Sequence, residues 1–197
     1  FVSLLKRADM TRYELFLRET RTYEIIEDVK NFRSEIGVLF LNSYNRDVLT
    51  KMFDDNRLTY TSLFKARPHI FVSKSNPLAK HEVVSLEDLE EFPYLSYDQG
   101  IHNSFYYSEE ILSQIPHKKS IVVSDRATLF NLLIGLDGYT IATGILNSNL
   151  NGDNIVSIPL DIDDEIDIVY LKHEKATLSK MGEKFLDNLV KEVTFDN

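Results

Sequence analysis

The sequence predicts an α/β protein with a mostly parallel sheet, and three observations support this class. Segments of strand composition alternate with segments of helical periodicity along the 197 residues. Residues 36–41 form a continuous apolar run, which is typical of a strand buried on both faces. Proline and glycine separate many of these segments, so the connections are short. The loop-rich middle and the single C-terminal helix also suit a division into two lobes.

The first quarter of the chain begins with helical periodicity. Residues 1–6 have the pattern of an amphipathic helix whose start is missing, and we expect the chain to be a piece of a longer protein. Residues 13–18 have strand composition. Thr20 or Thr22 can cap the next helix, in which acidic residues come early and basic residues late. The buried strand at 36–41 precedes a short helix at 46–54.

The middle of the chain is rich in strands. Strands are predicted at 58–65 and 69–74, with Pro68 between them, and at 94–97. Ser85 and Asp88 fit a capping box at a helix start, and Pro93 ends that helix. Residues 104–115 are expected to be helical, with Pro116 as the stop.

The last third repeats the alternation. A strand at 120–124 leads to a helix at 127–136, which Asp125 caps and residues 137–138 close. A strand at 139–143 precedes a polar loop at 147–154, and further strands follow at 155–160 and 166–172. One apolar stripe marks a final helix: Leu178, Met181, Phe185, Leu189 and Val193.

Composition excludes several classes of function. With 22 basic and 31 acidic residues the net charge is −9, so the chain itself is a poor binder of nucleic acid. The absence of cysteine excludes disulfides, thiolate zinc sites and cysteine nucleophiles. The five histidines have no metal-ligand spacing, and no apolar run approaches the roughly 20 residues of a membrane span. No phosphate-binding glycine loop or nucleophile elbow is present, so we expect no metal, cofactor or membrane contact.

Three polar segments follow predicted strands and precede predicted helices. They are residues 19–22, 96–107 and 124–128. In open α/β sheets, ligands bind outside the carboxyl ends of strands, where all three segments are placed. Helix capping is the alternative for 19–22, and an ordinary loop with inward-packed aromatics is the alternative for 96–107. None of the three contains an activated nucleophile or an acid and base pair, so binding is favoured over catalysis.

A series of motifs carries a resemblance to a known family. Residues 36–40 stand where LysR-type transcriptional regulators have a D-L-A-I-like strand, and Asn76-Pro77-Leu78-Ala79 is similar to their H-P-L-A. Residues 84–89 and 92–95 follow in the family's order, and residues 138–142 are similar to its G-x-G-I-A. Residues 158–160 and the final helix complete the series, which covers nearly the whole chain. The chain resembles the effector-binding domain of these regulators.

The resemblance implies a two-lobed, periplasmic-binding-protein-like (type 2) fold with mixed, mostly parallel sheets. One lobe would comprise residues 1–64 and 173–197, and the other residues 65–172. Antiparallel crossover strands near 63–72 and 166–172 would form the hinge. The family's first strand and its winged helix-turn-helix would lie before Phe1.

It also implies a function. A small metabolite, such as an amino acid or an organic acid, would bind between the lobes of a cytoplasmic homodimer or tetramer and alter its geometry. DNA would be contacted only by the separate N-terminal domain, and no catalysis is expected. The ligand-binding residues carried over from the family by position are Thr20, Arg21, Thr22, Tyr97, Gln99, Gly100, Ser124, Arg126 and Thr143.

Two other hypotheses remain at this point. An extracytoplasmic solute-binding protein shares the two-lobed architecture and would carry a signal peptide upstream. An enzyme on a related scaffold would show turnover that depends on Arg21, Arg126 or His102, but no residue spacing supports it. In the regulator, Arg21 would contribute to effector binding, through a charge-assisted contact if the effector is anionic.

Overall fold

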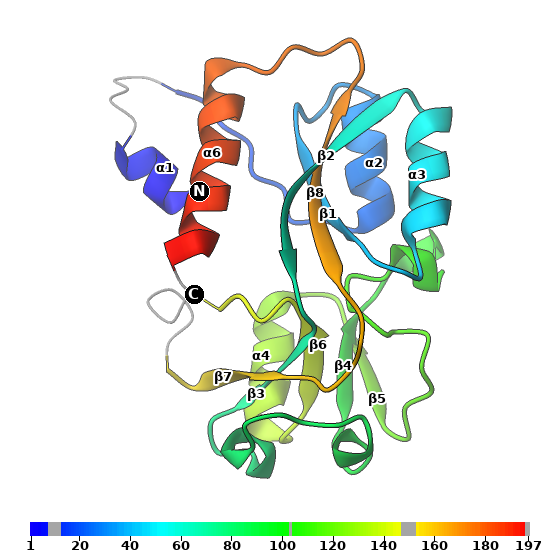
Figure 1. Cartoon of the computed structure of the whole chain (residues 1–197), viewed down its shortest axis with the longest axis vertical. Helices are drawn as coiled ribbons and strands as arrows, with labels where there is room; N and C mark the ends of the chain where they lie inside the picture. Colours follow the sequence, from blue (N-terminus) through cyan, green and yellow to red (C-terminus); the bar gives the residue numbers. More distant parts are fainter. Residues whose placement is uncertain (8–12, 103, 147–152, 196–197) are drawn as a thin grey trace.

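Two β-sheets organise the protein in a computed structural model that describes residues 1–7, 13–102, 104–146 and 153–195. A three-stranded sheet has the order β1-β8-β2, and a five-stranded sheet has the order β5-β4-β6-β3-β7. Each sheet has its own hydrophobic core and its own helices (Figure 1). We call the part built on the three-stranded sheet the upper lobe and the part built on the five-stranded sheet the lower lobe.

The upper lobe is built around its central strand. β8 (Ile166–His173) lies between β1 (Gly37–Leu41) and β2 (Leu58–Ala66) and is antiparallel to both. Helices α2 (Thr22–Lys30) and α3 (Arg46–Asp55) pack on this sheet through amphipathic faces. Their buried apolar side chains join those of the strands: Ile26, Val29, Leu39, Leu41, Leu49, Phe53, Leu58, Val169 and Leu171.

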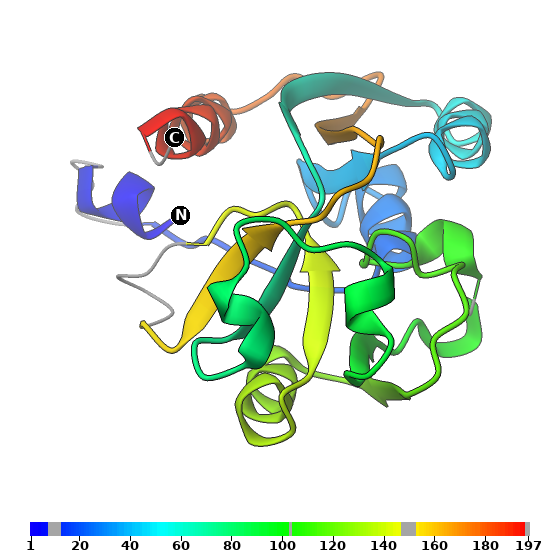
Figure 2. The ribbon, with the colours of Figure 1, turned by 60° about the horizontal axis from the view of Figure 1, so that its bottom comes forward.

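The two terminal helices of the chain lie together. α6 (Lys180–Phe195) lies across the sheet from α3, and α1 (Val2–Arg7) lies beside α6 (Figures 1 and 2). The rings of Phe1 and Phe185 meet edge to face with centroids 6.2 Å apart. The ends of the described chain therefore both belong to the upper lobe.

The lower lobe contains the other five strands. β4 (Tyr94–Tyr97) is parallel to its neighbours β5 (Ser120–Val123) and β6 (Tyr139–Ala142). β3 (His69–Ser73) is antiparallel to both β6 and β7 (Ile155–Pro159). Helix α4 (Arg126–Gly135) packs on β3, β4 and β5.

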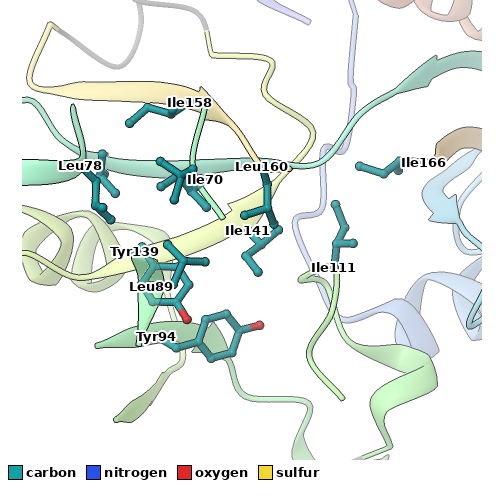
Figure 3. Close-up of a cluster of buried hydrophobic side chains, with 12 residues drawn as sticks. Ile70, Leu78, Leu89, Tyr94, Ile111, Tyr139, Ile141, Ile158, Leu160 and Ile166 are labelled. Carbon is teal, nitrogen blue, oxygen red and sulfur yellow. The ribbon is translucent and has the colours of Figure 1, made fainter. Parts of the chain in front are cut away.

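Short 3₁₀ helices connect the strands of the lower lobe. They are η1 (Pro77–Lys80), η2 (Glu87–Leu89), η3 (Gly100–His102) and η4 (Phe105–Tyr107). The main core of this lobe lies between the strands, η1 and η2 (Figure 3). Ile166, the first residue of β8, packs in that core, whereas Val169 packs in the core of the upper lobe. β8 therefore spans both cores.

Two neighbouring strands connect the lobes. β2 and β8 are hydrogen-bonded along their lengths, from Leu58 opposite His173 to Ala66 opposite Ile166. β2 leads into β3 of the lower sheet, and β8 is reached from β7 of that sheet (Figure 1). The ladder has a register irregularity between Ser62 and Phe64. Such an irregularity bends a strand locally and increases its twist.

Most strands match the sequence predictions to within a residue or two, and so do α3 and α4. Asp125 caps α4 as predicted, because its carboxylate accepts the N–H of Thr128 at 2.9 Å. The mixed α/β class is confirmed, but the predicted dominance of parallel pairs is wrong for the described strands. The sequence pattern of strand, helix and strand correctly makes β1 and β2 parallel to each other. They are not neighbours, however, because β8 lies between them and pairs antiparallel with both.

Three local predictions are wrong. Residues 104–115 form only the short η4 and turns. Here the hydroxyl of Ser104 accepts the N–H of Tyr106, and Leu112 has a positive φ of 62°. Residues 13–18 join no sheet in the structure. Neither Thr20 nor Thr22 caps α2: Arg21 holds the cap position, and the hydroxyl of Thr20 donates to the Glu24 carboxylate.

The predicted capping box is present on a shorter element. Ser85 donates its N–H to Asp88 at 2.9 Å, and Asp88 donates its N–H to the Ser85 hydroxyl at 3.3 Å. The element that follows is the three-residue η2 instead of an α-helix. Of the predicted polar loop at 147–154, residues 147–152 lie outside the described residues. In the described part of the chain, no helix is long and apolar enough to cross a membrane.

Candidate functional site

A pocket of about 290 Å³ lies where the two lobes face each other. The upper lobe contributes the segment before α2 and its first turn. The lower lobe contributes the end of β4, the loop after it and the start of α4. The residues that line the pocket are Glu19, Thr20, Arg21, Glu24, Tyr97, Asp98, Glu109, Ser124, Asp125 and Arg126.

The structure brings five of the nine predicted ligand residues to this pocket. They are Thr20, Arg21, Tyr97, Ser124 and Arg126. Their ligand contacts stay a prediction. Tyr97 ends β4 and Ser124 follows β5, whereas Thr20 and Arg21 follow residues 13–18, which join no sheet.

The other four predicted residues do not line the pocket. Thr22 is buried at 6% exposure at the start of α2. Gln99 is buried behind Glu109, and Gly100 lies against the guanidinium of Arg21. Thr143 follows the end of β6 and belongs to another part of the lower lobe.

Arg21 joins the two lobes. Its Nη2 lies 2.8 Å from Asp98 Oδ2, and its Nε donates to the carbonyl of Asp98 at 2.8 Å. Nη1 lies 3.2 Å from Glu24 Oε1 on the same side of the pocket. Gly100 permits this packing, because a Cβ there would lie 2.8 Å from Arg21 Nη1 and its φ is +63°.

Arg126 makes the second connection between the lobes. Its Nε lies 3.1 Å from Glu19 Oε1, and its guanidinium lies 5.9 Å from the ring centroid of Phe130. Arg126 is held at the start of α4 by the Asp125 cap. Hydrogen bonds from the Thr128 N–H and hydroxyl lower the pKa of Asp125.

Two adjacent glutamates lie beside the pocket. Glu110 is 3% exposed and accepts hydrogen bonds from the Tyr97 N–H at 2.7 Å and the Ser108 hydroxyl at 3.0 Å. Burial nevertheless raises the pKa of Glu110 to about 7. Glu109 faces the pocket, and burial raises its pKa too, opposed by a long hydrogen bond of 3.4 Å from Gln99 Nε2.

Sequence reasoning missed Glu24 and Glu109. Glu24 carries the ordinary signal of an acidic residue in a first helical turn, so nothing marked it as a pocket residue. Glu109 was expected on a solvated helix. The signal that could have indicated it is a pair of glutamates separated from an aromatic run by a single serine.

Aromatic contacts link the lobes beside the pocket. The ring of Tyr23 in α2 stacks on His102 with centroids 3.5 Å apart. The ring of Tyr44 stacks on Tyr106 at 4.8 Å. Tyr107 packs against the core of the upper lobe, although it lies between strands of the lower lobe. The lobes therefore meet in this structure through salt bridges on one side and aromatic rings on the other.

A second pocket of about 400 Å³ has a more apolar lining. It lies between residues 14–18, the β1 side of the upper sheet and α6. Phe16 and Leu17 are exposed at 77% and 66%. It shares only Thr20 with the predicted ligand residues.

The interlobe pocket has the polar lining and the size of a small-molecule site. Within the described ranges, no three histidine or carboxylate side chains are arranged to hold a metal ion. Hydroxyls, carboxylates and two guanidiniums surround a gap the size of a small metabolite. The fold and this site define a two-lobed domain of the kind that binds small molecules between its lobes.

The family comparison identifies this domain. The family model described as the LysR substrate binding domain matches residues 7–194. The chain therefore belongs to this family, the effector-binding domains of LysR-type transcriptional regulators, and its type 2 periplasmic-binding-protein-like fold is confirmed. No curated protein matches the chain with significance.

Solved structures agree on the fold. The C-terminal domain of a probable LysR family transcriptional regulator from Rhodococcus sp. RHA1 is 16% identical, with a TM-score of 0.64 over 96% of this chain and 90% of that one. HinK, a LysR family transcriptional regulator from Pseudomonas aeruginosa, is 15% identical, with a TM-score of 0.61 over 89% of this chain. The chain spans 59% of the length of HinK.

A third similar structure contains a ligand. The effector binding domain of BenM with its effector benzoate is 18% identical, with a TM-score of 0.58 over 89% of this chain and 76% of that one. At these identities the likeness concerns the fold.

Proposed function

We propose that this chain senses a small metabolite for a LysR-type transcriptional regulator. The metabolite binds in the interlobe pocket, and the observation that carries the proposal is the pair of salt bridges at its rim. Arg21–Asp98 and Arg126–Glu19 each join one lobe to the other beside the gap. A ligand that contacts these groups has a different affinity for open and closed lobes, which is the condition for a population shift.

The hinge of this movement is the pair of crossing strands. The division predicted from the sequence assigns residues 1–64 and 173–197 to one lobe and residues 65–172 to the other. Because β8 is the central strand of the upper sheet and Val169 packs in the upper core, we move the second boundary to the start of β8, near Ile166. Closure changes the relative orientation of two rigid cores, as in other hinged binding domains.

The output is a change in assembly. We infer that the regulator is a cytoplasmic homodimer or tetramer and that lobe closure alters its geometry. DNA is bound by a separate N-terminal helix-turn-helix, which accords with the net charge of −9 on this chain. The family match favours this reading over an extracytoplasmic solute-binding protein or an enzyme.

A thermal-shift screen against amino acids, organic acids and amines tests the sensing role. A compound that binds only the folded chain raises the melting temperature with the logarithm of its concentration. Sedimentation velocity with and without the hit then tests the assembly. The proposal predicts at least one dose-dependent hit, and a strictly monomeric chain at high concentration would contradict the assembly step.

A further inference from the structure

We propose that the ligand of the interlobe pocket is an organic cation whose primary ammonium group is bound by the carboxylate of Glu109. This inference rests on the proposed function, because it names the ligand class for the same pocket. It assigns the main contact to Glu109, whereas the sequence-based expectation was that Arg21 contributes to effector binding, through a charged contact if the effector is anionic.

The charges around the pocket favour a cation. Five carboxylates and two guanidiniums line it, an excess of three negative charges. The carboxylates come from both lobes: Glu19, Glu24, Asp98, Glu109 and Asp125. Such a cleft concentrates cations and repels anions, because walls of low dielectric focus the field of the charges.

Both guanidiniums are already paired with carboxylates. Arg21 is held by the carboxylate and the carbonyl of Asp98, both at 2.8 Å, and by Glu24 at 3.2 Å. Arg126 is paired with Glu19 at 3.1 Å. An anionic ligand that took either arginine would leave a pocket carboxylate without its cation, and the displaced charge would then face the ligand.

The carboxylates are engaged too, with one exception among the described residues. Glu24 and Asp98 bond to Arg21, and Glu19 bonds to Arg126. Asp125 accepts the N–H and hydroxyl of Thr128. Glu109 has no cation within ion-pair distance in the described structure, and its bond from Gln99 Nε2 is long at 3.4 Å.

The surroundings of Glu109 indicate that its charge is uncompensated. Burial is the main cause of its raised pKa, which means that the ionised carboxylate has lost water without gaining an equal partner. Gln99 beside it is 6% exposed, and its Oε1 has no hydrogen-bond partner in the described structure. An ammonium offers three donors. Glu109, Ser124 and Tyr97 line the same gap.

Calorimetry and thermal shift with matched probes test this inference on the chain itself. Putrescine and L-lysine carry the ammonium, 1,4-butanediol is the uncharged counterpart of putrescine, and benzoate and glutarate are the acidic probes, which carry no ammonium. We expect the two amines to raise the melting temperature with dose, and we expect the diol and the acids to have no effect.

Glu109→Gln is the decisive variant, because it removes the charge and keeps the shape. We expect at least about a tenfold loss of amine affinity, the usual effect of losing a charged hydrogen-bond partner. Glu82→Gln, at an exposed position outside the pocket, is the control and should bind amines as the parent does. Without ligand, Glu109→Gln should melt at a higher temperature than the parent at pH 8, which shows that the variant folds.

The outcomes separate the two proposals. If the acidic probes bind and the amines do not, the proposal of a cationic ligand is contradicted and the sensing role is left intact. Amine binding that is equal in Glu109→Gln and the parent would also overturn the role of Glu109. If no probe of either charge and no compound of the screen binds, both the ligand class and the sensing role are rejected.

Discussion

Glu110 shows how one buried carboxyl makes folding depend on pH. Burial raises its pKa from the ordinary 4.5 to about 7, so the folded chain holds a proton that the unfolded chain releases. The contribution of Glu110 to the free energy of unfolding is therefore fully present below pH 4.5 and is lost as the pH rises to about 7. The loss is on the order of 3 kcal/mol.

Glu110→Gln should flatten this part of the pH profile. Glutamine can accept the Tyr97 N–H and donate to the Ser108 hydroxyl, so the packing is kept. Urea unfolding between pH 5 and pH 8 measures the slope. Glu109, whose pKa is also raised by burial, makes the free energy of unfolding fall with rising pH as well. The variant should therefore keep part of the pH dependence. An unchanged slope, equal to that of an exposed control such as Glu82→Gln, would contradict the assignment.

Gly100 is a second residue whose identity is set by the pocket. Its φ is +63°, and a Cβ there would lie 2.8 Å from Arg21 Nη1. Gly100→Ala should cost roughly 1–2 kcal/mol in backbone strain and should also displace Arg21 from Asp98. Gly135→Ala is the matched control, since a Cβ at this helical position meets no atom within 4 Å. It should be neutral or stabilise the chain in the same thermal unfolding experiment.

At the scale of elements, η4 connects the lobes by inserting an aromatic side chain into the neighbouring lobe. Tyr107 packs on the upper core, and its ring centroid lies 5.6 Å from that of Tyr23 in α2. A double-mutant cycle of Tyr23→Ala and Tyr107→Ala should give a coupling of about 0.5–1.5 kcal/mol. Tyr23→Ala with Phe105→Ala is the control, because Phe105 is 59% exposed on the same element. Equal couplings in the two cycles would show that η4 makes no specific contact with α2.

Elements were predictable where local chemistry and burial agree. The run at 36–41 and the Asp125 cap indicated β1 and α4 correctly, since periodicity and capping are local signals. Residues 104–115 were not predictable in this way. Here the carboxylate of Glu110 accepts the N–H of Tyr97 at the end of the preceding strand, a contact beyond the range of helical periodicity. The strand expected at 13–18 fails for a related reason, because β-structure requires a neighbouring strand and composition does not supply one.

The position of the candidate site was predictable from the sequence, but the pairing of its charged side chains was not. The ends of β4 and β5 indicated where Tyr97 and Ser124 would gather, whereas Thr20 lines the pocket although residues 13–18 join no sheet. The pairing of Arg21 with Asp98 joins residues far apart in the sequence, and no local pattern reports it. Sequence reasoning therefore assigned a free guanidinium to the pocket, where the structure has a neutralised one.

At the scale of the whole molecule, the rim salt bridges should govern the angle between the lobes. Exposed ion pairs contribute below about 1 kcal/mol each, so the double variant Arg21→Ala, Arg126→Ala should lose little stability. It should nevertheless open, and its radius of gyration in small-angle scattering should increase. Lys118→Ala removes a pair with Glu90 inside the lower lobe and should leave the radius unchanged. A double variant as compact as the parent would show that the aromatic contacts alone hold the lobes.

The two crossing strands have a mechanical consequence. Because β2 and β8 are hydrogen-bonded to each other, they act as one ribbon and not as two separate tethers. A ribbon of this kind resists stretching and sideways shear, but it twists readily, and the irregularity at Ser62 and Phe64 is its weakest point. We therefore expect relative motion of the lobes to be confined to essentially one coordinate. Under the proposed function, the rest of the protein would receive the occupation of the pocket as a single torsional variable.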